Sequence, residues 1–115
     1  MAEWMAFADR DARERDCPQG ALLLYHVYRG VVVEPYDERR ATDMYTHWAR
    51  LPDNGWIETN ERRPGSADAD YRGCVLAWHR YDGFVLRGWR RFREDKYLER
   101  WMPVPAGPIA TDCNL

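Results

Sequence analysis

A self-similarity at a spacing of 53 residues constrains this chain more than any other feature. When the sequence is shifted by 53 positions, residues 20–54 align without a gap on residues 73–107, and nine of the 35 aligned positions are identical. The identities include His26/His79, Tyr28/Tyr81 and Trp48/Trp101, which are residue types that rarely match by chance. A fixed period of this length is typical of a duplicated structural unit. We therefore expect repeats at 4–54 and 56–107, followed by a tail at 108–115.

Each repeat contains a predicted β-hairpin. In the second repeat an Asp-Gly pair, Asp82-Gly83, separates two apolar runs, a pattern typical of a two-residue type I′ turn. The predicted arms are Cys74–Tyr81 and Phe84–Arg90, with Tyr81 opposite Phe84. This pairing also places His79 opposite Leu86 and Trp78 opposite Arg87.

In the first repeat the predicted strands are Ala21–Tyr28 and Val31–Tyr36, joined by Arg29-Gly30. Because Pro35 has no N–H to donate to a sheet, the return strand is expected at an edge. Such an edge also suggests a homodimer formed by strand addition.

The remaining segments are less regular. Residues Trp4–Phe7 are expected to form a short edge strand, and the alternating charges of Asp9–Asp16 indicate a solvated turn of helix or loop. The spacing of apolar residues in Asp37–Leu51 fits a helix, but a loop followed by a short strand around Trp48 fits equally well. The polar stretch Asn60–Asp70 is expected to be a mobile loop.

Chain length and composition determine how the repeats are expected to combine. The chain has 115 residues, of which 45% are hydrophobic and 14% aromatic, so it can form a substantial core. Each half has only about 50 residues, a size at which a core is marginal by itself. We therefore predict a single compact domain over residues 1–115 with a β-rich α+β fold. Two tandem hairpin repeats with pseudo-twofold symmetry are expected to share one aromatic core.

The sequence also indicates the cellular compartment in which we expect the protein. No apolar run approaches the roughly 20 residues that a membrane helix needs. The N-terminal segment MAEWMAFADRD is acidic and lacks the apolar core of a signal peptide. Cys17, Cys74 and Cys113 occupy no equivalent repeat positions and form no C-x-x-C motif, which favours reduced thiols. We expect a cytoplasmic protein in a bacterial host cell.

No pattern of residues predicts catalysis. The sequence has no P-loop, no G-x-G-x-x-G, no H-E-x-x-H and no G-x-S-x-G motif. His26, His47 and His79 have no cysteine or carboxylate at metal-ligand spacing, so they are expected to be structural. We expect no enzymatic activity, no catalytic residues, no cofactor and no metal.

Two sets of residues are candidates for binding. In the first, arginines interleave with aromatic residues: Arg87, Trp89, Arg90, Arg91 and Arg93. Cations beside aromatic rings suit an acidic protein partner or a nucleic acid, and they also suit a solvated surface. Residues 1–54 carry seven arginines and ten acidic residues, a net charge of −3, which disfavours nucleic acid.

The second set depends on the expected symmetry. If the halves pair about a pseudo-twofold axis, His26, Tyr28, His79 and Tyr81 lie near a cleft between the repeats. Their rings would stack on a nucleotide base while an arginine reaches its phosphate. This arrangement suits a small-molecule sponge or sensor.

The second repeat resembles a known family. It contains Trp56-Ile57, an Arg-Pro turn, Val75-Leu76-x-Trp and a closing Arg100–Pro105 of sequence RWMPVP. In these features Trp56–Pro105 resembles the domain of unknown function 551, a family of small domains common in phages and prophages. The resemblance extends to Trp4–Pro52 in degraded form. It implies a phage or mobile-element accessory protein and carries no activity with it.

These observations together suggest a function. We expect a non-enzymatic protein that binds and inhibits a bacterial defence complex, such as a CRISPR effector, by protein–protein contact. The alternatives are a nucleotide-binding sponge or sensor and a nucleic-acid-binding accessory protein.

Overall fold

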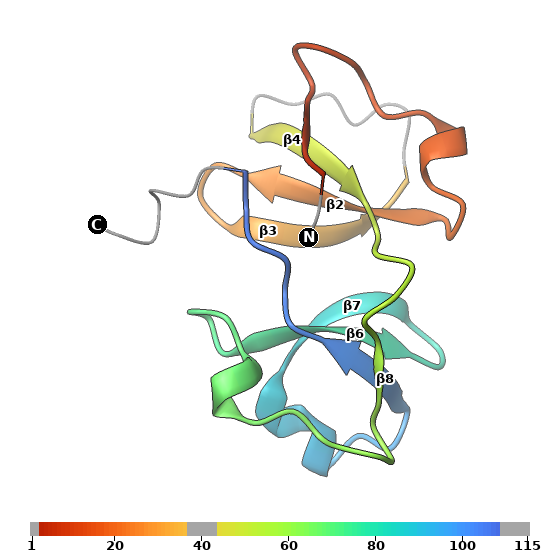
Figure 1. Cartoon of the computed structure of the whole chain (residues 1–115), viewed down its shortest axis with the longest axis vertical. Coiled ribbons are helices and arrows are strands. Elements are labelled where there is room, and N and C mark those ends of the chain that lie inside the picture. Colours follow the sequence, from red (N-terminus) through yellow and green to blue (C-terminus); the bar gives the residue numbers. More distant parts are fainter. Residues whose placement is uncertain (1–2, 37–43, 109–115) are drawn as a thin grey trace. The chain divides into compact units, whose positions relative to one another are not determined.

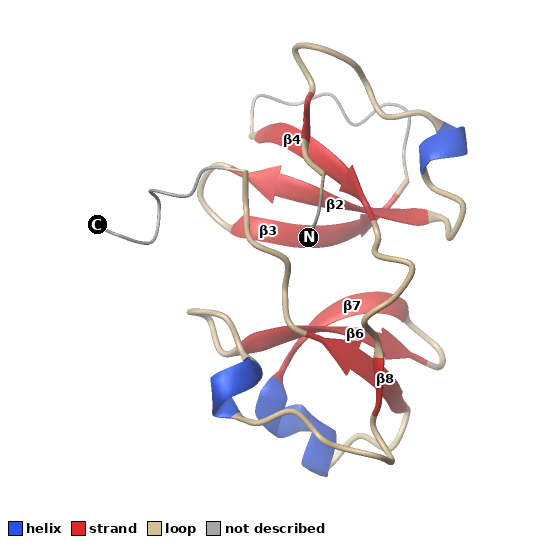
Figure 2. Ribbon diagram, in the orientation of Figure 1, coloured by secondary structure: helices blue, strands red, loops and turns tan. Residues whose placement is uncertain are grey.

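A computed structural model describes residues 3–36 and 44–108 of the chain (Figure 1). The fold is β-rich, as predicted, with two four-stranded antiparallel sheets. Within the described residues the helical elements are short 3₁₀ turns (Figure 2). The chain divides into a first unit, Met1–Pro52 with Pro105–Leu115, and a second unit, Asp53–Val104.

The sheet of the first unit has the strand order β1-β4-β2-β3. Its elements are β1 (Met5–Ala6), η1 (Glu14–Asp16), β2 (Ala21–His26), β3 (Gly30–Pro35) and β4 (Tyr45–Arg50). The β-branched run in β3 favours a strand. Both predicted edge strands, β1 and β3, lie at the edges of this sheet.

The sheet of the second unit has the order β5-β8-β6-β7. Its elements are β5 (Ile57–Glu58), η2 (Ser66–Asp68), β6 (Cys74–His79), β7 (Gly83–Gly88), η3 (Trp89–Arg93) and β8 (Leu98–Met102). The order repeats that of the first sheet strand for strand. Strands β2 and β3 begin 53 residues before β6 and β7, as the aligned sequences do.

The segment Asp37–Leu51, for which the sequence allowed either a helix or a loop and a strand, contains a strand in its described part. Residues Tyr45–Arg50 are β4, so the alternative of a strand around Trp48 is correct there. The part of the segment at 37–43 lies outside the described residues.

The predicted hairpin register is wrong. In the structure His79 pairs with Gly83, Trp78 with Phe84 and Leu76 with Leu86, which leaves a three-residue loop. Gly83 has φ 79°, and no non-glycine residue in the described ranges has positive φ, so the loop is not a type I′ turn. A three-residue loop with glycine in the left-handed region is a different hairpin class. The first hairpin has the same form, with His26 opposite Gly30.

This register changes which side chains share a face. A shift by an odd number of residues turns every side chain of the return strand to the other side of the sheet. Trp78 therefore faces Phe84, with their ring centroids 4.8 Å apart, and not Arg87. The opposite face carries Ala77 and Val85.

Each unit buries apolar side chains against its own sheet. In the second unit a cluster forms around Trp101, which is fully buried, and consists of Val75, Ala77, Phe92, Leu98 and Trp101. In the first unit Leu24 and Trp48 are paired across β2 and β4, and both are buried. A single core shared by both halves stays a prediction.

Candidate functional site

An arginine–aspartate pair closes a loop over the buried tryptophan of the first unit. The Arg10 guanidinium donates two hydrogen bonds to the Asp16 carboxylate, at 3.0 and 3.2 Å. The same guanidinium lies 4.8 Å from the centre of the Trp48 ring. The Trp48 Nε1–H donates to the Arg10 carbonyl oxygen at 2.8 Å. These contacts tie residues 10–16 to β4.

The second unit repeats this arrangement. Arg62 donates to the Asp68 carboxylate at 3.0 and 3.3 Å and lies 4.8 Å from the Trp101 ring. The Trp101 Nε1–H donates to the Arg62 carbonyl oxygen at 2.8 Å. Sequence reasoning missed both pairs, although Arg and Asp recur six residues apart in each half.

The environment of Asp16 corrects an expectation. Asp9–Asp16 was expected to be solvated, but the Asp16 side chain is only 1% exposed. It accepts hydrogen bonds from Arg10, from the Arg13 backbone N–H and from Arg50. The hydrogen bonds from Arg10 hold the pKa of this carboxyl well below its ordinary value, although burial acts in the opposite direction. We assign this cluster a structural role.

The two repeated histidines organise the hairpin loops. His79 Nδ1 accepts the backbone N–H groups of Tyr81 and Asp82, each at 3.1 Å. The ring proton is therefore on Nε2, which lies 3.1 Å from the Asp95 carboxylate and donates to it. His26 Nδ1 accepts the N–H groups of Tyr28 and Arg29 in the same way. Because each histidine accepts hydrogen bonds from the loop of its own hairpin, we assign both a structural role.

The tyrosines of these loops are exposed. Tyr28 is 80% exposed and Tyr81 70% exposed. Each lies beside the histidine of its own hairpin, with ring centroids 6.2 Å apart in both. The structure thus brings together His26 with Tyr28 and His79 with Tyr81, in separate units. The predicted cleft that would combine all four stays a prediction.

The predicted arginine strip contains residues with different environments. Arg87 is not available as a free cation, because it forms an ion pair with Asp82 at 3.2 Å and donates to the Leu86 carbonyl oxygen. Phe92, in the middle of η3, is 3% exposed and belongs to the core cluster of the second unit. Trp89 is half-buried, and the Arg90 guanidinium lies 5.2 Å from the centre of its ring.

Three arginines of the strip remain exposed: Arg90, Arg91 and Arg93. None of them forms an ion pair with any residue in the ranges 3–36 and 44–108. By contrast, every arginine that does form a described ion pair is paired with a carboxylate of its own unit. We use "the η3 surface" for Trp89, Arg90, Arg91 and Arg93.

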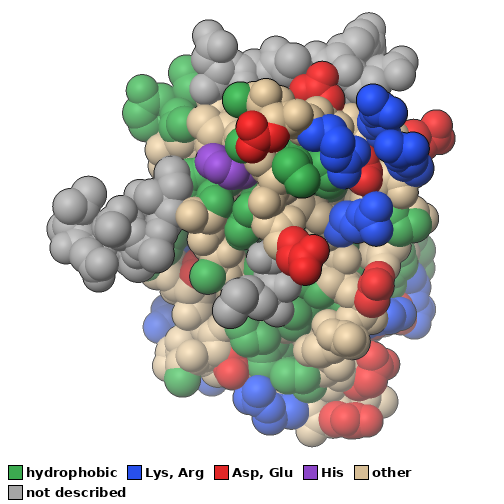
Figure 3. All heavy atoms as spheres, turned by 45° about the horizontal axis from the view of Figure 1, so that its top comes forward, with side chains coloured by type: hydrophobic (Ala, Val, Ile, Leu, Met, Phe, Trp, Pro, Cys, Tyr) green, Lys and Arg blue, Asp and Glu red, His purple; other side chains and the backbone are tan. Residues whose placement is uncertain are grey.

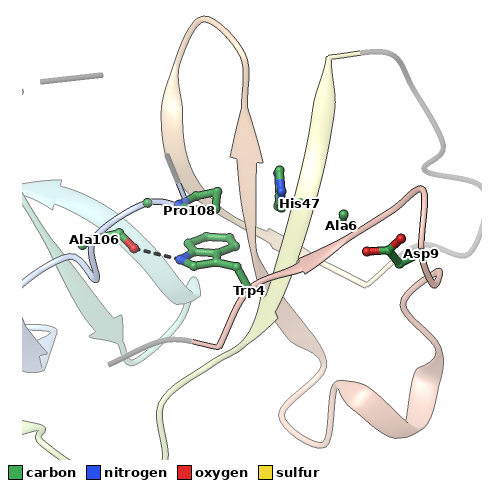
Figure 4. A pocket seen from close by; sticks show the side chains of 7 residues that line it. Trp4, Ala6, Asp9, His47, Ala106 and Pro108 are labelled. Carbon is green, nitrogen blue, oxygen red and sulfur yellow. Dashed lines mark hydrogen bonds between the residues drawn. The ribbon is translucent and has the colours of Figure 1, made fainter. Parts of the chain in front are cut away.

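A pocket of about 460 Å³ opens in the first unit (Figure 4). The described residues that line it are Trp4, Ala6, Asp9, His47, Ala106, Gly107 and Pro108. The Trp4 Nε1–H donates to the Ala106 carbonyl oxygen at 2.8 Å, which joins the N-terminal strand to the segment after residue 104. Sequence reasoning missed this pocket because its walls are about 100 residues apart in the chain.

The wall formed by Gly107 requires glycine. A Cβ atom at this position would lie 2.9 Å from Cε1 of Tyr25, closer than side-chain carbons normally approach. The His47 ring meets the same Tyr25 ring edge-on, with their centroids 6.3 Å apart and their planes nearly perpendicular. The pocket therefore lies against an aromatic layer on one face of the first sheet.

The thiols and the acidic side chains suggest no further chemistry. Cys17 and Cys74 are free thiols, and burial raises the pKa of each. In the part of the chain that the structure describes, no group of three His, Cys, Asp or Glu side chains is placed to hold a metal ion. Nor does any helix there have the length and apolar character needed to cross a membrane.

Charges of both signs are interspersed on the surface. The space-filling view shows basic and acidic side chains side by side on the face it presents, with hydrophobic ones between them (Figure 3). Several basic side chains gather toward the upper right of this view, with acidic side chains at their margins.

Comparisons with protein-family models, with curated proteins and with solved structures find no match to this chain.

Proposed function

We propose that this protein is a non-enzymatic binding module that docks an acidic surface of a partner protein through the η3 surface. The observation that carries the proposal is the set of three exposed arginines without a carboxylate partner in the described residues. Other arginines of the same unit, Arg62, Arg72 and Arg80, are each paired with an acidic side chain.

The η3 surface is attached to the core of the second unit. Phe92 is buried in the core, so the short turn that carries the arginines is anchored by one of its own residues. Arginine and tryptophan are the residue types that most often dominate the energy of protein interfaces. Guanidinium groups form their strongest hydrogen bonds with carboxylates, and pre-organised side chains lose less entropy on binding.

A protein partner fits this surface better than a nucleic acid. One face of the Trp89 ring is covered by the Arg90 guanidinium and is not open to a stacked base. The η3 surface contributes three cations that form no ion pair with a described residue, and residues 1–54 carry a net charge of −3. Nucleic-acid binding relies on many phosphate contacts and on a surface of one charge.

The resemblance, and not the geometry, is the basis for the partner that we propose. The similarity to small phage and prophage domains supports a phage or mobile-element accessory protein. We propose that its partner is a bacterial defence complex, such as a CRISPR effector, which the protein inhibits by contact.

The test compares two variants with the same change of charge. Arg90→Glu/Arg93→Glu alters the η3 surface, whereas Arg15→Glu/Arg63→Glu alters two exposed arginines elsewhere. Tagged proteins are incubated with lysate of a CRISPR-bearing bacterium and bound proteins are quantified by mass spectrometry. We expect defence subunits to be enriched by the wild type and by the control, and to be lost with Arg90→Glu/Arg93→Glu. On the defended host, phage growth should be supported by the wild type and by the control variant, and not by Arg90→Glu/Arg93→Glu.

Two results would contradict the proposal. Equal binding by both variants would remove the η3 surface from the interface. Binding of the wild type to DNA or RNA, with an affinity that falls steeply as salt increases, would favour the nucleic-acid alternative.

We also propose that the chain arose by tandem duplication and that its halves share one aromatic core. The support is the aligned sequence together with the equal strand orders and the repeated Arg–Asp–Trp and His–Tyr arrangements. The marginal size of each half supports the shared core.

A further inference from the structure

We propose that the pocket beside Trp4 in the first unit binds an organic cation, a guanidinium or alkylammonium group. The proposal does not depend on the η3 surface, because the pocket belongs to the other unit. Three observations carry it: the charge of the lining residues, the fixed tryptophan ring, and the way in which the second unit fills the equivalent position.

The lining residues have the charge that a cation needs. Of the described residues around the pocket, Asp9 is the one with an acidic side chain, and no arginine or lysine is among them. Asp9 is exposed, and its carboxylate has no hydrogen bond or ion pair within residues 3–36 and 44–108. In the view of Figure 4, Asp9 lies on the Ala6 side of the pocket, and Ala6 stands between it and the Trp4 indole. An unpaired carboxylate attracts a cation and repels phosphates and other anions.

The Trp4 ring is held in place before any ligand arrives. Its Nε1–H is bonded to the Ala106 carbonyl oxygen, and its ring meets Tyr25 edge-on with centroids 6.3 Å apart. Figure 4 shows the indole between Ala106 on one side and Ala6 on the other. Tryptophan gives the strongest cation–π attraction of the aromatic residues, and a fixed ring costs little entropy on binding.

The second unit has an arginine at the position that His47, a lining residue of the pocket, occupies in the first unit. Arg100 aligns with His47, and Trp78 aligns with Tyr25, in the 53-residue repeat. The Arg100 guanidinium lies 5.9 Å from the centre of the Trp78 ring. In the first unit the shorter imidazole of His47 replaces the arginine and meets Tyr25 edge-on. The first unit therefore has no arginine at the position of Arg100, and the His47 imidazole that stands there lines the pocket.

The pocket has the size of a small-ligand site. A volume of about 460 Å³ lies within the range of roughly 300–1,000 Å³ that is usual for such sites. This space admits an arginine or lysine side chain, or a free amine of similar size.

The test uses ligands that differ mainly in charge. N-acetylargininamide, N-acetyllysinamide and the neutral isostere N-acetylcitrullinamide are titrated into the full-length protein while amide and indole NMR signals are recorded. We expect saturable shifts of the Trp4 indole N–H and of residues around His47 with the arginine or lysine compound. The citrulline compound should give no saturable shift, because it lacks the charge.

A pair of matched variants locates the site. Asp9→Asn removes the carboxylate at the pocket, and Asp11→Asn makes the same change at an exposed aspartate that does not line it. We expect Asp9→Asn to weaken binding of the cationic compound about tenfold, and Asp11→Asn to leave it unchanged. The spectra of the unliganded variants show whether the fold is retained away from the substitution.

The proposal is overturned if neither cationic compound gives a saturable shift at Trp4. It is also overturned if the citrulline compound binds as tightly as the arginine compound, or if both aspartate variants bind alike. None of these results bears on the η3 surface, so the two proposals fail independently.

Discussion

At the scale of single residues, the paired Arg and Asp side chains show how two polar loops are attached to the buried tryptophans. Arg10 and Asp16 lie in a stretch whose charges predict solvation, yet their hydrogen bonds place the Arg10 guanidinium over the Trp48 ring. The flat guanidinium stacks on the indole while its N–H groups meet the carboxylate, a combination that lysine does not provide. Arg62, Asp68 and Trp101 make the same contacts in the second unit.

This arrangement predicts an acid-sensitive stability. The pKa of Asp16 is lower in the folded chain than its ordinary value of about 3.9, so the folded state favours the charged form. The resulting stabilisation is present above about pH 4 and is lost as the pH falls below it. Asp16→Asn should lower the free energy of unfolding at neutral pH and make it less dependent on pH between about 2 and 5, as measured by urea unfolding at several pH values.

The equivalent residue Asp68 provides the comparison. Its pKa is also lowered, but its side chain is 21% exposed against 1% for Asp16. Solvent weakens ion pairs that it can reach. Asp68→Asn should therefore have the smaller effect, and equal effects of the two substitutions would contradict this explanation.

At the scale of elements, the histidine loops determine the strand register. In each hairpin the histidine that ends the first arm accepts two loop N–H groups, and a glycine with positive φ begins the return strand. There is room for a side chain at Gly83. A Cβ atom placed there would lie 4.0 Å from its nearest neighbour, an atom of the Trp78 ring. A side chain at this position would therefore destabilise the fold through the strained backbone conformation and not through a steric clash.

Gly83→Ala tests this conclusion. A residue with a Cβ pays about 1–2 kcal/mol in the left-handed region, so the free energy of unfolding should fall by roughly that amount. Gly88→Ala is the control, because Gly88 has φ −59° and a Cβ there meets only ordinary contacts at 3.8 and 3.9 Å. Urea unfolding of both variants measures the difference. A loss as large for Gly88→Ala as for Gly83→Ala would show that the loop conformation is not responsible.

At the scale of the whole molecule, the proposed shared core predicts that neither half is stable alone. A fragment of residues 53–104 keeps all strands of the second sheet, but a chain of about 50 residues buries too little apolar surface for a stable fold. We expect this fragment to show no cooperative urea transition by circular dichroism, while the full chain shows one. A cooperative transition of the isolated fragment would mean that the second unit has a sufficient core of its own.

The sequence by itself determined the existence of both hairpins and the edge positions of β1 and β3, and its 53-residue self-similarity is the basis for the proposed duplication. These features depend on residue identity and on local chemistry: a 53-residue spacing, apolar runs beside Gly30 and Gly83, and a proline without an N–H. It did not determine the register, because the Asp-Gly rule considers only the turn residues and not the histidine that bonds the loop. Nor could a charged stretch reveal that Asp16 is buried.

Only the tertiary structure determined the candidate sites. Trp4 and Ala106 form one pocket although they are 102 residues apart, and no local pattern predicts such a contact. The predicted arginine strip lies on β7 and η3. Which of its members lack a partner depends on Asp82 across the hairpin, which pairs with Arg87, and on the buried Phe92, which belongs to the core. Residue types establish which interactions are possible, whereas long-range packing decides which of them are already satisfied within the chain and which remain for a ligand or a partner.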